Sequence, residues 1–485
     1  MTRTSFLKNN LPYILLVFLC IILSIFFLPE SLERTLVVLL LLIGSLILLF
    51  YTKNSILSSA LFLLFVLPLN ITFQLPESVS IFGTELILSN PYVNGVYVNY
   101  LVPTIALTDL ALLLFCFASF TSRRKILIKN ISIQYLWYVV PLIIFLLLQD
   151  ILIFSPLHLL NTLRIFLIIF AIFCFLFTFP WNEAKKRLNL FLLSVSFGII
   201  SQGVLGTLQF LRGSSVGLSF LGESQVVSGM QGSSFVELGG QLFLRAYGTF
   251  PHPNLLGGYL LLVFLFLIVL EKYLKGRKKY FVYILFALIL IFAIFTFSRI
   301  VLLLLFLSLM LFLVSKFRLI KATNLYSFTP TLLLERFANL LISKDNSLAD
   351  RLNLLRVSIH VLKENILLGT GIGSYVQAMG ENVPRTAKGI LLLQPVHNIF
   401  ILLLSELGIV GFLATILFVF RLFVLNVKKV TTYSILILLC IFVIGMFDHY
   451  LVSLPQGLTL LILFQILFFF ESEGLKQYED NVDED

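Results

Sequence analysis

Charge is what this sequence has little of. Only 12% of its 485 residues are charged, whereas 59% are hydrophobic and 50 are phenylalanine. A soluble domain carries about 25% charged residues, and the mean hydropathy of this chain is +1.04. These proportions exclude a soluble globular domain and indicate a protein whose surface faces lipid.

Cysteine is scarce as well. No pair of cysteines has the spacing of metal ligands, and none lies in a loop where a disulfide would be expected. We therefore read them as small core residues that carry no redox information. All four lie inside apolar runs, at Cys20, Cys116, Cys174 and Cys440.

Long apolar runs are abundant instead, and many hold at most one charge. Each reaches or approaches the roughly 20 residues that a helix needs to cross a hydrocarbon core of about 30 Å. Because backbone amides in lipid must bond within their own segment, we read these runs as helices. The sequence predicts an all-α polytopic membrane protein with roughly 12–14 transmembrane helices. The first runs are Leu11–Pro29, Thr35–Tyr51, Ile56–Leu75, Leu101–Phe120 and Gln134–Leu148.

The net charge of +10 at pH 7 is open to two readings. One is a nucleic-acid surface, but short basic clusters between apolar runs are the pattern of cytoplasmic loops. With Arg3 and Lys8 before the first run, this pattern places the N-terminus in the cytoplasm. No A-x-A-like cleavage site follows that run, so we read it as an uncleaved anchor. The clusters are Arg123, Arg124, Lys125 and Lys129; Lys185, Lys186 and Arg187; Lys272, Lys275, Arg277, Lys278 and Lys279; and Arg421, Lys428 and Lys429.

The predicted topology divides the chain into six parts. The N-terminal part includes a first polar loop at about 74–101, which we expect on the extracytoplasmic side. The parts are N-terminal transmembrane helices over 1–211, an extracytoplasmic loop over 212–253 that ends in an arginine motif, central transmembrane helices over 254–314, a large polar and mainly extracytoplasmic loop with short helices over 315–396, C-terminal transmembrane helices over 397–470, and an acidic cytoplasmic tail over 471–485.

One crossing is difficult to place. Lys316, Arg318 and Lys321 mark an inner end, and the helix that starts near Asn398 must run inward again to reach its own basic cluster. The chain then has to re-cross at about 323–336, a stretch that is short and polar for a spanning helix. Either it crosses as a short segment shielded by neighbours, or the positive-inside pattern fails here.

Two arginines and one histidine fall on the outer face in this topology. Arg245 ends one loop, Arg351 lies in the large loop, and His397 precedes a membrane helix. A guanidinium binds phosphate bidentately, and histidine can take a proton from a hydroxyl. The set suits an anionic phosphate joined to a group that must be deprotonated. The alternatives are solvated charges, headgroup contacts or helix caps, and a cap is also the simple reading of Asn398.

Two further features have a structural and a functional reading. The glycine run Gly369–Gly373 resembles a phosphate-binding loop, but it follows a predicted helix, so a C-cap and turn is the other reading. Asp109 and Arg164 lie in or near membrane helices, where an ionisable residue is a functional hypothesis by default. Equally, the two side chains could pair and order the bundle.

Four motifs in order resemble the O-antigen ligase and polymerase superfamily. Arg245–Asn254 (RAYGTFPHPN) looks like its R-x-x-G-x-x-x-x-P-N signature, and Ser298-Arg299 matches its S-R motif. Asp350–Gly373 resembles R-x-x-x-W…P-x-x-G-x-G-x-G, and His397-Asn398 with Glu406–Gly411 matches H-N…E-x-G-x-x-G. Leu355 replaces the usual Trp and Ile366 the usual Pro. The motifs cover roughly the second half of the chain, while the first half is similar only in hydropathy.

The resemblance implies a GT-C-like helical fold and a glycosyltransferase. Members transfer a glycan from a polyprenyl-diphosphate carrier to an acceptor hydroxyl on the outer face of the bacterial plasma membrane, with no metal ion or cofactor. The acceptor is a glycolipid, a growing glycan or a protein, and the motifs do not separate ligase from polymerase. The first outer loop, Pro29–Arg34, agrees, because it has no D-x-D pair for a divalent cation.

The resemblance also implies roles for residues. Arg245 and Arg351 would hold the donor diphosphate and stabilise it as a leaving group, and His397 would orient or deprotonate the acceptor hydroxyl. Asp448 and His449, at the outer end of a late helix, are candidates for sugar contacts or a helix-end hydrogen bond. The expected substrate-binding set is Arg299, Asn254, Asn398, Glu406, Asp448 and His449.

Two other classes of function compete. A transporter or flippase of lipid-linked oligosaccharides predicts charged residues at mid-membrane and related halves with broken helices. This chain instead concentrates its polar residues in two outer loops and shows no duplicated half. A membrane scaffold without catalysis would leave the ordered Arg, Arg and His motifs unexplained. Partners of the predicted enzyme are the donor lipid, the acceptor and the bilayer, with no nucleic acid.

Overall fold

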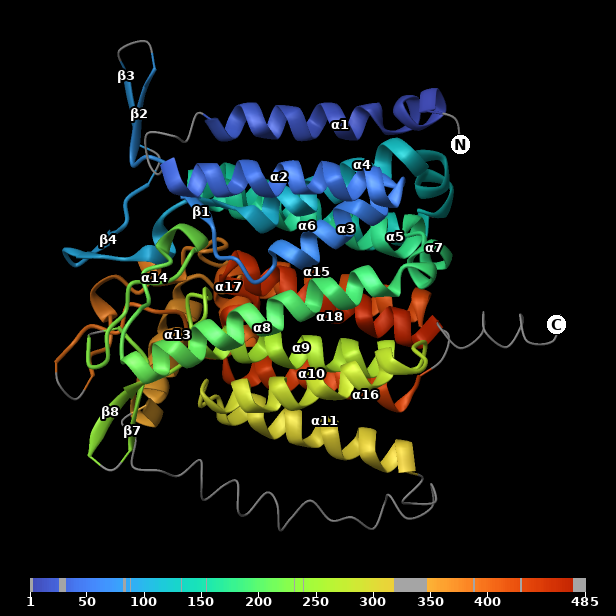
Figure 1. The fold of residues 1–485 in the computed structure, drawn as a ribbon. Coiled ribbons are helices and arrows are strands. Elements are labelled where there is room, and N and C mark those ends of the chain that lie inside the picture. Colours follow the sequence, from blue (N-terminus) through green and yellow to red (C-terminus); the bar gives the residue numbers. More distant parts are fainter. Residues whose placement is uncertain are drawn as a thin grey trace.

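Long helices lie side by side and make up most of this computed structural model (Figure 1). The structure describes residues 3–25, 32–81, 84–87, 89–131, 133–153, 155–230, 232–238, 240–317, 347–386, 389–427 and 430–473. Within these ranges, eight helices are long and apolar enough to cross a membrane, by length and composition. The predicted all-α polytopic membrane fold is confirmed.

The long helices other than α13 follow the apolar runs of the sequence. Those of the first half are α1 (Arg3–Ile25), α2 (Leu32–Thr52), α3 (Ser55–Val66), α4 (Leu107–Asn130), α5 (Ile133–Ile153), α6 (Pro156–Thr178) and α8 (Leu188–Arg212). Those of the second half are α9 (Pro253–Glu271), α10 (Arg277–Ile294), α11 (Arg299–Phe317), α13 (Ser347–Glu364), α15 (Ile399–Asn426), α16 (Thr432–Phe447) and α18 (Pro455–Glu473). Short helices are α7 (Trp181–Lys186), α14 (Tyr375–Ala378), α17 (Tyr450–Ser453), η1 (Asn99–Leu101), η2 (Ser219–Leu221) and η4 (Gly380–Asn382).

Short antiparallel strand pairs gather at one end of the bundle, together with α13 and α14 (Figure 1). We call this the hairpin end. The start of α1 and the end of α18 lie at the opposite end. The pairs are β1 (Thr72–Gln74) with β6 (Thr104–Ala106), β2 (Ser78–Ile81) with β3 (Thr84–Ile87), β4 (Tyr92–Val93) with β5 (Val96–Tyr97), and β7 (Phe235–Leu238) with β8 (Gln241–Leu244).

The expectation of a helix over Ile56–Leu75 was wrong in its second half. Helix α3 ends at Val66, and Thr72–Gln74 is strand β1. Pro68 explains the early end, because proline lacks the N–H that would continue the hydrogen bonds of the helix. The chain therefore leaves the bundle earlier than its hydropathy indicates and runs into the hairpins.

Two apolar cores hold the molecule together. The large one runs through the helix bundle and includes all four cysteines, which are buried and form no disulfide. The small one lies at the hairpin end and includes Leu354 and Val361 of α13, Leu402 of α15, and Val396 just before α15. Because Leu354 and Val361 are seven residues apart, they lie on one face of α13 and fix how that helix is seated.

Helix α15 breaks at Gly408, where φ is 61° and ψ is −177°. The backbone groups freed by the break bond to the segment after α13. Ile409 donates its N–H to the carbonyl of Ile366 at 2.9 Å, and Gly371 donates to the carbonyl of Glu406 at 2.9 Å. A buried backbone break needs such partners, so the glycines of both motifs serve one close contact between α15 and the loop before α14.

The same glycine run also packs against α5 and α6. A Cβ on Gly371 would stand 2.6 Å from Cδ2 of His158, and one on Gly373 would stand 2.3 Å from Nδ2 of Asn161. Gly369 donates its N–H to the carbonyl of Asn365 at 2.8 Å, as in a helix C-cap. Of the two readings of this run, the structure shows the C-cap and turn, and the glycines allow close packing.

The two ionisable residues of the first half pair with each other. Arg164 of α6 lies 2.8 Å from the carboxylate of Asp109 in α4. The same guanidinium donates to the carbonyl of Thr104 at 2.6 Å. The reading in which this pair orders the bundle is therefore the one that the structure shows.

Two predictions concern residues outside the described ranges. Helix α11 ends at the end of the bundle opposite the hairpins and α13 lies at the hairpin end (Figure 1). The predicted crossing at about 323–336 lies between them, outside the described residues. The acidic tail also lies outside them beyond Glu473, while its first three residues continue α18.

The break in α15 gives a stability prediction. A Cβ on Gly408 would stand 2.3 Å from the carbonyl oxygen of Leu367, at a positive φ that L residues rarely adopt. We expect Gly408→Ala to lower the free energy of unfolding by about 3 kcal/mol, through steric overlap and backbone strain. Thermal unfolding in detergent measures this. Gly44→Ala in α2 is the matched control, because its Cβ meets nothing within 4 Å, and an equal loss in both variants would contradict the prediction.

Candidate functional site

Two glutamines of α8 accept hydrogen bonds from the backbone of the loop before α9. Gln209 accepts the N–H groups of Tyr247 and Gly248 at 3.0 and 2.8 Å, and Gln202 accepts that of Thr249 at 2.8 Å. The two glutamines are seven residues apart and so share one helix face. Gly248 has φ +60°, and a Cβ there would stand 2.3 Å from Oε1 of Gln202. These contacts fix the backbone of the first arginine motif.

Arg245 at the start of this motif is anchored by two acceptors. Its Nε donates to the carbonyl of Thr296, after α10, at 2.7 Å. One terminal nitrogen donates to Oδ1 of Asn254 at 2.6 Å. Asn254 in turn donates from Nδ2 to Oδ2 of Asp448 at 2.6 Å. The amide of Asn254 thus bridges a guanidinium and a carboxylate that are far apart in sequence.

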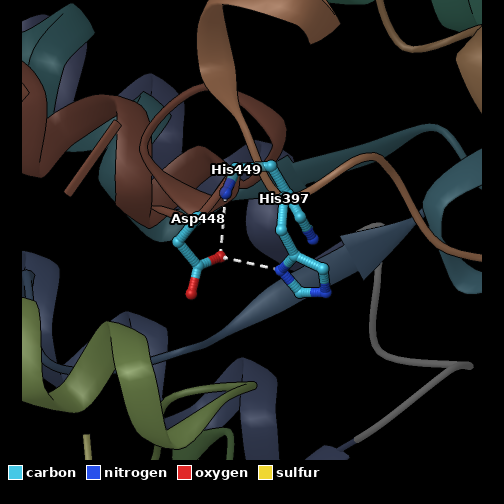
Figure 2. A group of neighbouring side chains, drawn as sticks. All are labelled: His397, Asp448 and His449. Carbon is cyan, nitrogen blue, oxygen red and sulfur yellow. Dashed lines mark hydrogen bonds and ion pairs between the residues drawn. The ribbon is translucent and has the colours of Figure 1, made fainter. Parts of the chain in front are cut away.

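Asp448 also contacts His397 and the backbone of His449 (Figure 2). Its Oδ1 accepts the backbone N–H of His449 at 2.8 Å and lies 3.6 Å from Nδ1 of His397. The other ring nitrogen of His397 points away from Asp448 (Figure 2). The rings of His397 and His449 have their centroids 5.1 Å apart. Asp448 therefore faces the Nδ1 side of His397 at ion-pair distance, and the other imidazole nitrogen is directed away from the carboxylate.

Three arginines from different elements lie close enough for their charges to interact. Arg245 comes from the loop after β8, Arg299 begins α11, and Arg351 lies on α13, one turn before the buried Leu354. Burial lowers the pKa of Arg245 to about 10; Tyr247 and Asp448 raise it in part, and the positive charges of Arg351 and Arg299 lower it further. Arg245 still keeps its proton at neutral pH. Such a collection of guanidiniums is suited to a multiply charged anion.

The single carboxylate in this group stays ionised. Burial acts to raise the pKa of Asp448, but its interactions with His397, and the nearby His449 and His252, hold the pKa well below its usual range. A carboxylate surrounded by donors and positive charge keeps its negative charge down to acid pH. The site therefore combines one fixed negative charge with several positive ones.

Two histidines beside Asp448 are neutral at physiological pH. Burial lowers the pKa of His252 to about 4, with Asp448 opposing the shift and Arg245 adding to it. Burial likewise lowers the pKa of His449 to about 3, with His397 adding to the shift and Asp448 opposing it. His252 caps α9 by accepting the N–H of Asn254 at 3.2 Å, and His449 lies 2.7 Å from the hydroxyl of Ser453. Both hold neighbouring groups in place as neutral rings.

The remaining predicted residues lie beside the site or further away. Asn398 is the N-cap of α15, accepting the N–H groups of Phe400 and Ile401 at 3.0 Å. Its simple reading as a cap is what the structure shows, and the cap sets the backbone next to His397. Glu406 lies roughly 12 Å further along α15, where its carboxylate faces the backbone N–H groups of Gly373 and Tyr375. Glu406 thus fastens the glycine run.

Three groups of this site would also suit a metal ion by residue type. His397, Asp448 and His449 offer ligand atoms that lie within 4.8 Å of one another (Figure 2). However, both oxygens of Asp448 already accept hydrogen bonds, from Asn254 and from the backbone of His449. Nδ1 of His449 is occupied by Ser453. With three arginines nearby, the arrangement fits an anion better than a cation.

Several supporting residues could not be identified from the sequence. Tyr100 packs edge-on against His449 with ring centroids 5.9 Å apart, and burial and the charge of Asp448 raise its pKa. A lone tyrosine in a loop gives no signal for this role. His252 stood inside a recognised motif without an assigned role. Gln202 and Gln209 did carry a signal, as two amides seven residues apart in an otherwise apolar helix.

Comparison with known proteins matches one family. The family model described as O-antigen ligase matches residues 255–416, from the first turn of α9 to within α15. This segment includes Arg299, Arg351 and His397, while Arg245 lies 10 residues before it and Asp448 lies 32 residues after it. No curated protein matches the chain.

The low pKa of His252 predicts a pH dependence of stability. Between about pH 6.5 and pH 4 the unfolded chain binds a proton that the folded chain excludes, so stability falls as the pH falls through this window. His252→Asn retains an N-cap acceptor but cannot titrate. We expect its unfolding temperature to drop less than that of the wild type between about pH 7 and about pH 5. His360→Asn, at a half-exposed histidine of α13, should behave like the wild type; equal pH slopes in all three proteins would refute the assignment.

Proposed function

We propose that this chain is a membrane glycosyltransferase of the O-antigen ligase and polymerase type, which transfers a glycan from a polyprenyl-diphosphate carrier to an acceptor hydroxyl. The match of residues 255–416 to the O-antigen ligase family model and the eight candidate membrane spans support this proposal. Two observations carry the proposal: Arg245, Arg299 and Arg351 lie close enough for their charges to interact, and Arg245 is linked through Asn254 to Asp448, which lies 3.6 Å from Nδ1 of His397. Positive charge for a diphosphate and a proton acceptor for a hydroxyl are the two requirements of such a transfer.

In the proposed reaction the arginines bind the donor diphosphate. A guanidinium stays protonated and presents planar N–H pairs to phosphate oxygens. Arg245 is held by the carbonyl of Thr296 and by Asn254, so its orientation is set before the donor binds. Preorganised donors stabilise the charge that develops on a leaving group without reorganising during the reaction. Arg351 and Arg299 add charge from two other elements.

His397 is the proposed proton acceptor. Asp448 lies on its Nδ1 side at 3.6 Å, which favours the tautomer with a proton on Nδ1 and a free lone pair on Nε2. That nitrogen points away from the carboxylate (Figure 2). A carboxylate that orients a histidine and stabilises its protonated form is a recurring arrangement in acyl-transfer enzymes. Here it would serve a glycosyl transfer.

The proposed step is a single displacement. The acceptor oxygen attacks the anomeric carbon as the bond from that carbon to the phosphate oxygen breaks. The hydroxyl proton passes to Nε2 of His397, and the bonding electron pair leaves with the polyprenyl diphosphate, where the arginines neutralise its charge. The configuration at the anomeric carbon is inverted, and no covalent intermediate with the protein forms. Since guanidiniums supply the charge, the step needs no metal ion.

The charge distribution supports a proposal for the side of the membrane on which the site lies. The basic clusters at 123–129, 185–187 and 272–279 mark cytoplasmic loops by the positive-inside pattern. We therefore propose that the hairpin end, with the site, faces the extracytoplasmic side of a bacterial plasma membrane. A glycolipid, a growing glycan and a protein are all compatible acceptors, so ligase and polymerase remain two forms of the same proposal.

A transfer assay tests this function. The full-length protein in proteoliposomes is given a synthetic polyprenyl-diphosphate glycan and a hydroxyl acceptor, with EDTA present. We expect glycosylated acceptor and free polyprenyl diphosphate to form together. Arg245→Ala and Arg351→Ala should each slow transfer by about 10²- to 10³-fold, and His397→Ala by about 10²- to 10⁴-fold.

Matched controls are available on the same face. Arg385 is an exposed arginine and His360 a half-exposed histidine at the hairpin end, and alanine at either position should leave the rate unchanged. If the lipid-linked glycan changes leaflet with its diphosphate bond intact, the chain is a transporter and the proposal fails. Loss of transfer on adding EDTA would instead assign a metal ion to His397, Asp448 and His449.

A further inference from the structure

A small hairpin next to the site displays two tyrosines. Strands β4 and β5 pair Tyr92 with Tyr97 and Val93 with Val96. The tyrosine rings meet edge to face, with centroids 5.6 Å apart and an interplanar angle of 74°. Tyr92 is 50% exposed and Tyr97 is 43% exposed. Large apolar surface on both rings is therefore open to contact.

The base of this hairpin is firmly seated. Val93 and Val98 are buried in the small core of the hairpin end, 6% and 3% exposed. Asn94 at the turn donates from its amide to the carbonyl of Gly380 at 3.2 Å. Because side chains alternate along a strand, burying the valines holds the tyrosines on the opposite face. The rings are thus presented by a fixed backbone.

The hairpin is continuous with the proposed reaction site. Tyr97 precedes Tyr100 by three residues, so their Cα atoms are at most about 11 Å apart. The ring of Tyr100 lies against His449, with centroids 5.9 Å apart. His449 in turn neighbours His397. A chain of a few sugars that starts at His397 could therefore reach the tyrosine pair.

The position of the hairpin distinguishes its two tyrosines from the tyrosines that ordinarily lie at a membrane interface. Aromatic belts sit at headgroup level, where spanning helices end. Strand β4 instead lies beyond the ends of α1 and α2, on the side of α14 (Figure 1). This placement suits a ligand in the aqueous phase next to the site rather than a lipid.

We propose that Tyr92 and Tyr97 form a glycan-binding platform, on which pyranose rings adjacent to the transferred linkage stack. The proposal rests on the proposed function, since it names a subsite of the same reaction. One face of a pyranose carries polarised C–H bonds, which are attracted to the negative face of an aromatic ring. Tyrosine adds a hydroxyl that can bond to sugar hydroxyls, and its side chain has little rotational freedom to lose.

Binding of lipid-free oligosaccharides tests the platform apart from catalysis, because they have no diphosphate to transfer. The probes are β-1,4-linked hexasaccharides of glucose and of N-acetylglucosamine. They are added to the full-length protein in nanodiscs, and saturation-transfer NMR reports binding. We expect Tyr92→Ala and Tyr97→Ala each to weaken binding of at least one hexasaccharide about tenfold. Tyr97→Phe, which keeps the ring, should retain most of it.

A second edge-to-face tyrosine pair provides the matched control. Tyr280, 71% exposed, meets Tyr283 with centroids 6.3 Å apart, at the start of α10. Tyr280→Ala should leave oligosaccharide binding unchanged. The platform is refuted if neither hexasaccharide binds the wild type, or if Tyr97→Ala binds as well as Tyr280→Ala. A protein that transfers glycan but fails this binding test would keep its proposed function and lose only the platform.

Discussion

The side-chain amide of Asn254 is the contact on which the candidate site depends. It accepts from Arg245 and donates to Asp448, both at 2.6 Å. Asp448 faces His397 in turn. A buried charge is strongly destabilising unless a partner compensates it. The amide gives each charged group a hydrogen-bond partner. Because it lies between them, the guanidinium and the carboxylate do not form a direct ion pair through these atoms. A guanidinium held in this way remains available to an incoming anion.

The rest of the fold brings these groups to one point. Gln202 and Gln209 of α8 fix the backbone of the Arg245 loop. The small core seats α13, and with it Arg351. The break at Gly408 and the carboxylate of Glu406 fasten the glycine run beside α15. Many residues of these motifs thus serve to hold loops, whereas Arg245, Asn254, Arg351 and His397 form the site.

Hydropathy predicted the helices well because lipid imposes one strong rule, that each crossing segment satisfies its own backbone. It failed at Ile56–Leu75, where Pro68 ends α3 and the chain turns into β1, and it gave no hint of the hairpins. Arg245, Arg351 and His397 could be proposed from motifs alone. The partnership of Asn254 with Asp448 joins residues 194 positions apart, and Tyr100 touches the site only through tertiary packing, so neither could be derived from local patterns.

The most direct test asks whether the bridge and the carboxylate act as one unit. Asn254→Ala, Asp448→Ala and the double variant are compared by the single-turnover rate of glycan transfer, with thermal unfolding as a check that each protein is folded. If the amide acts through Asp448, the double variant should be no slower than the slower single variant, to within about twofold. Rate losses that multiply in the double variant would show two independent effects and contradict the shared network.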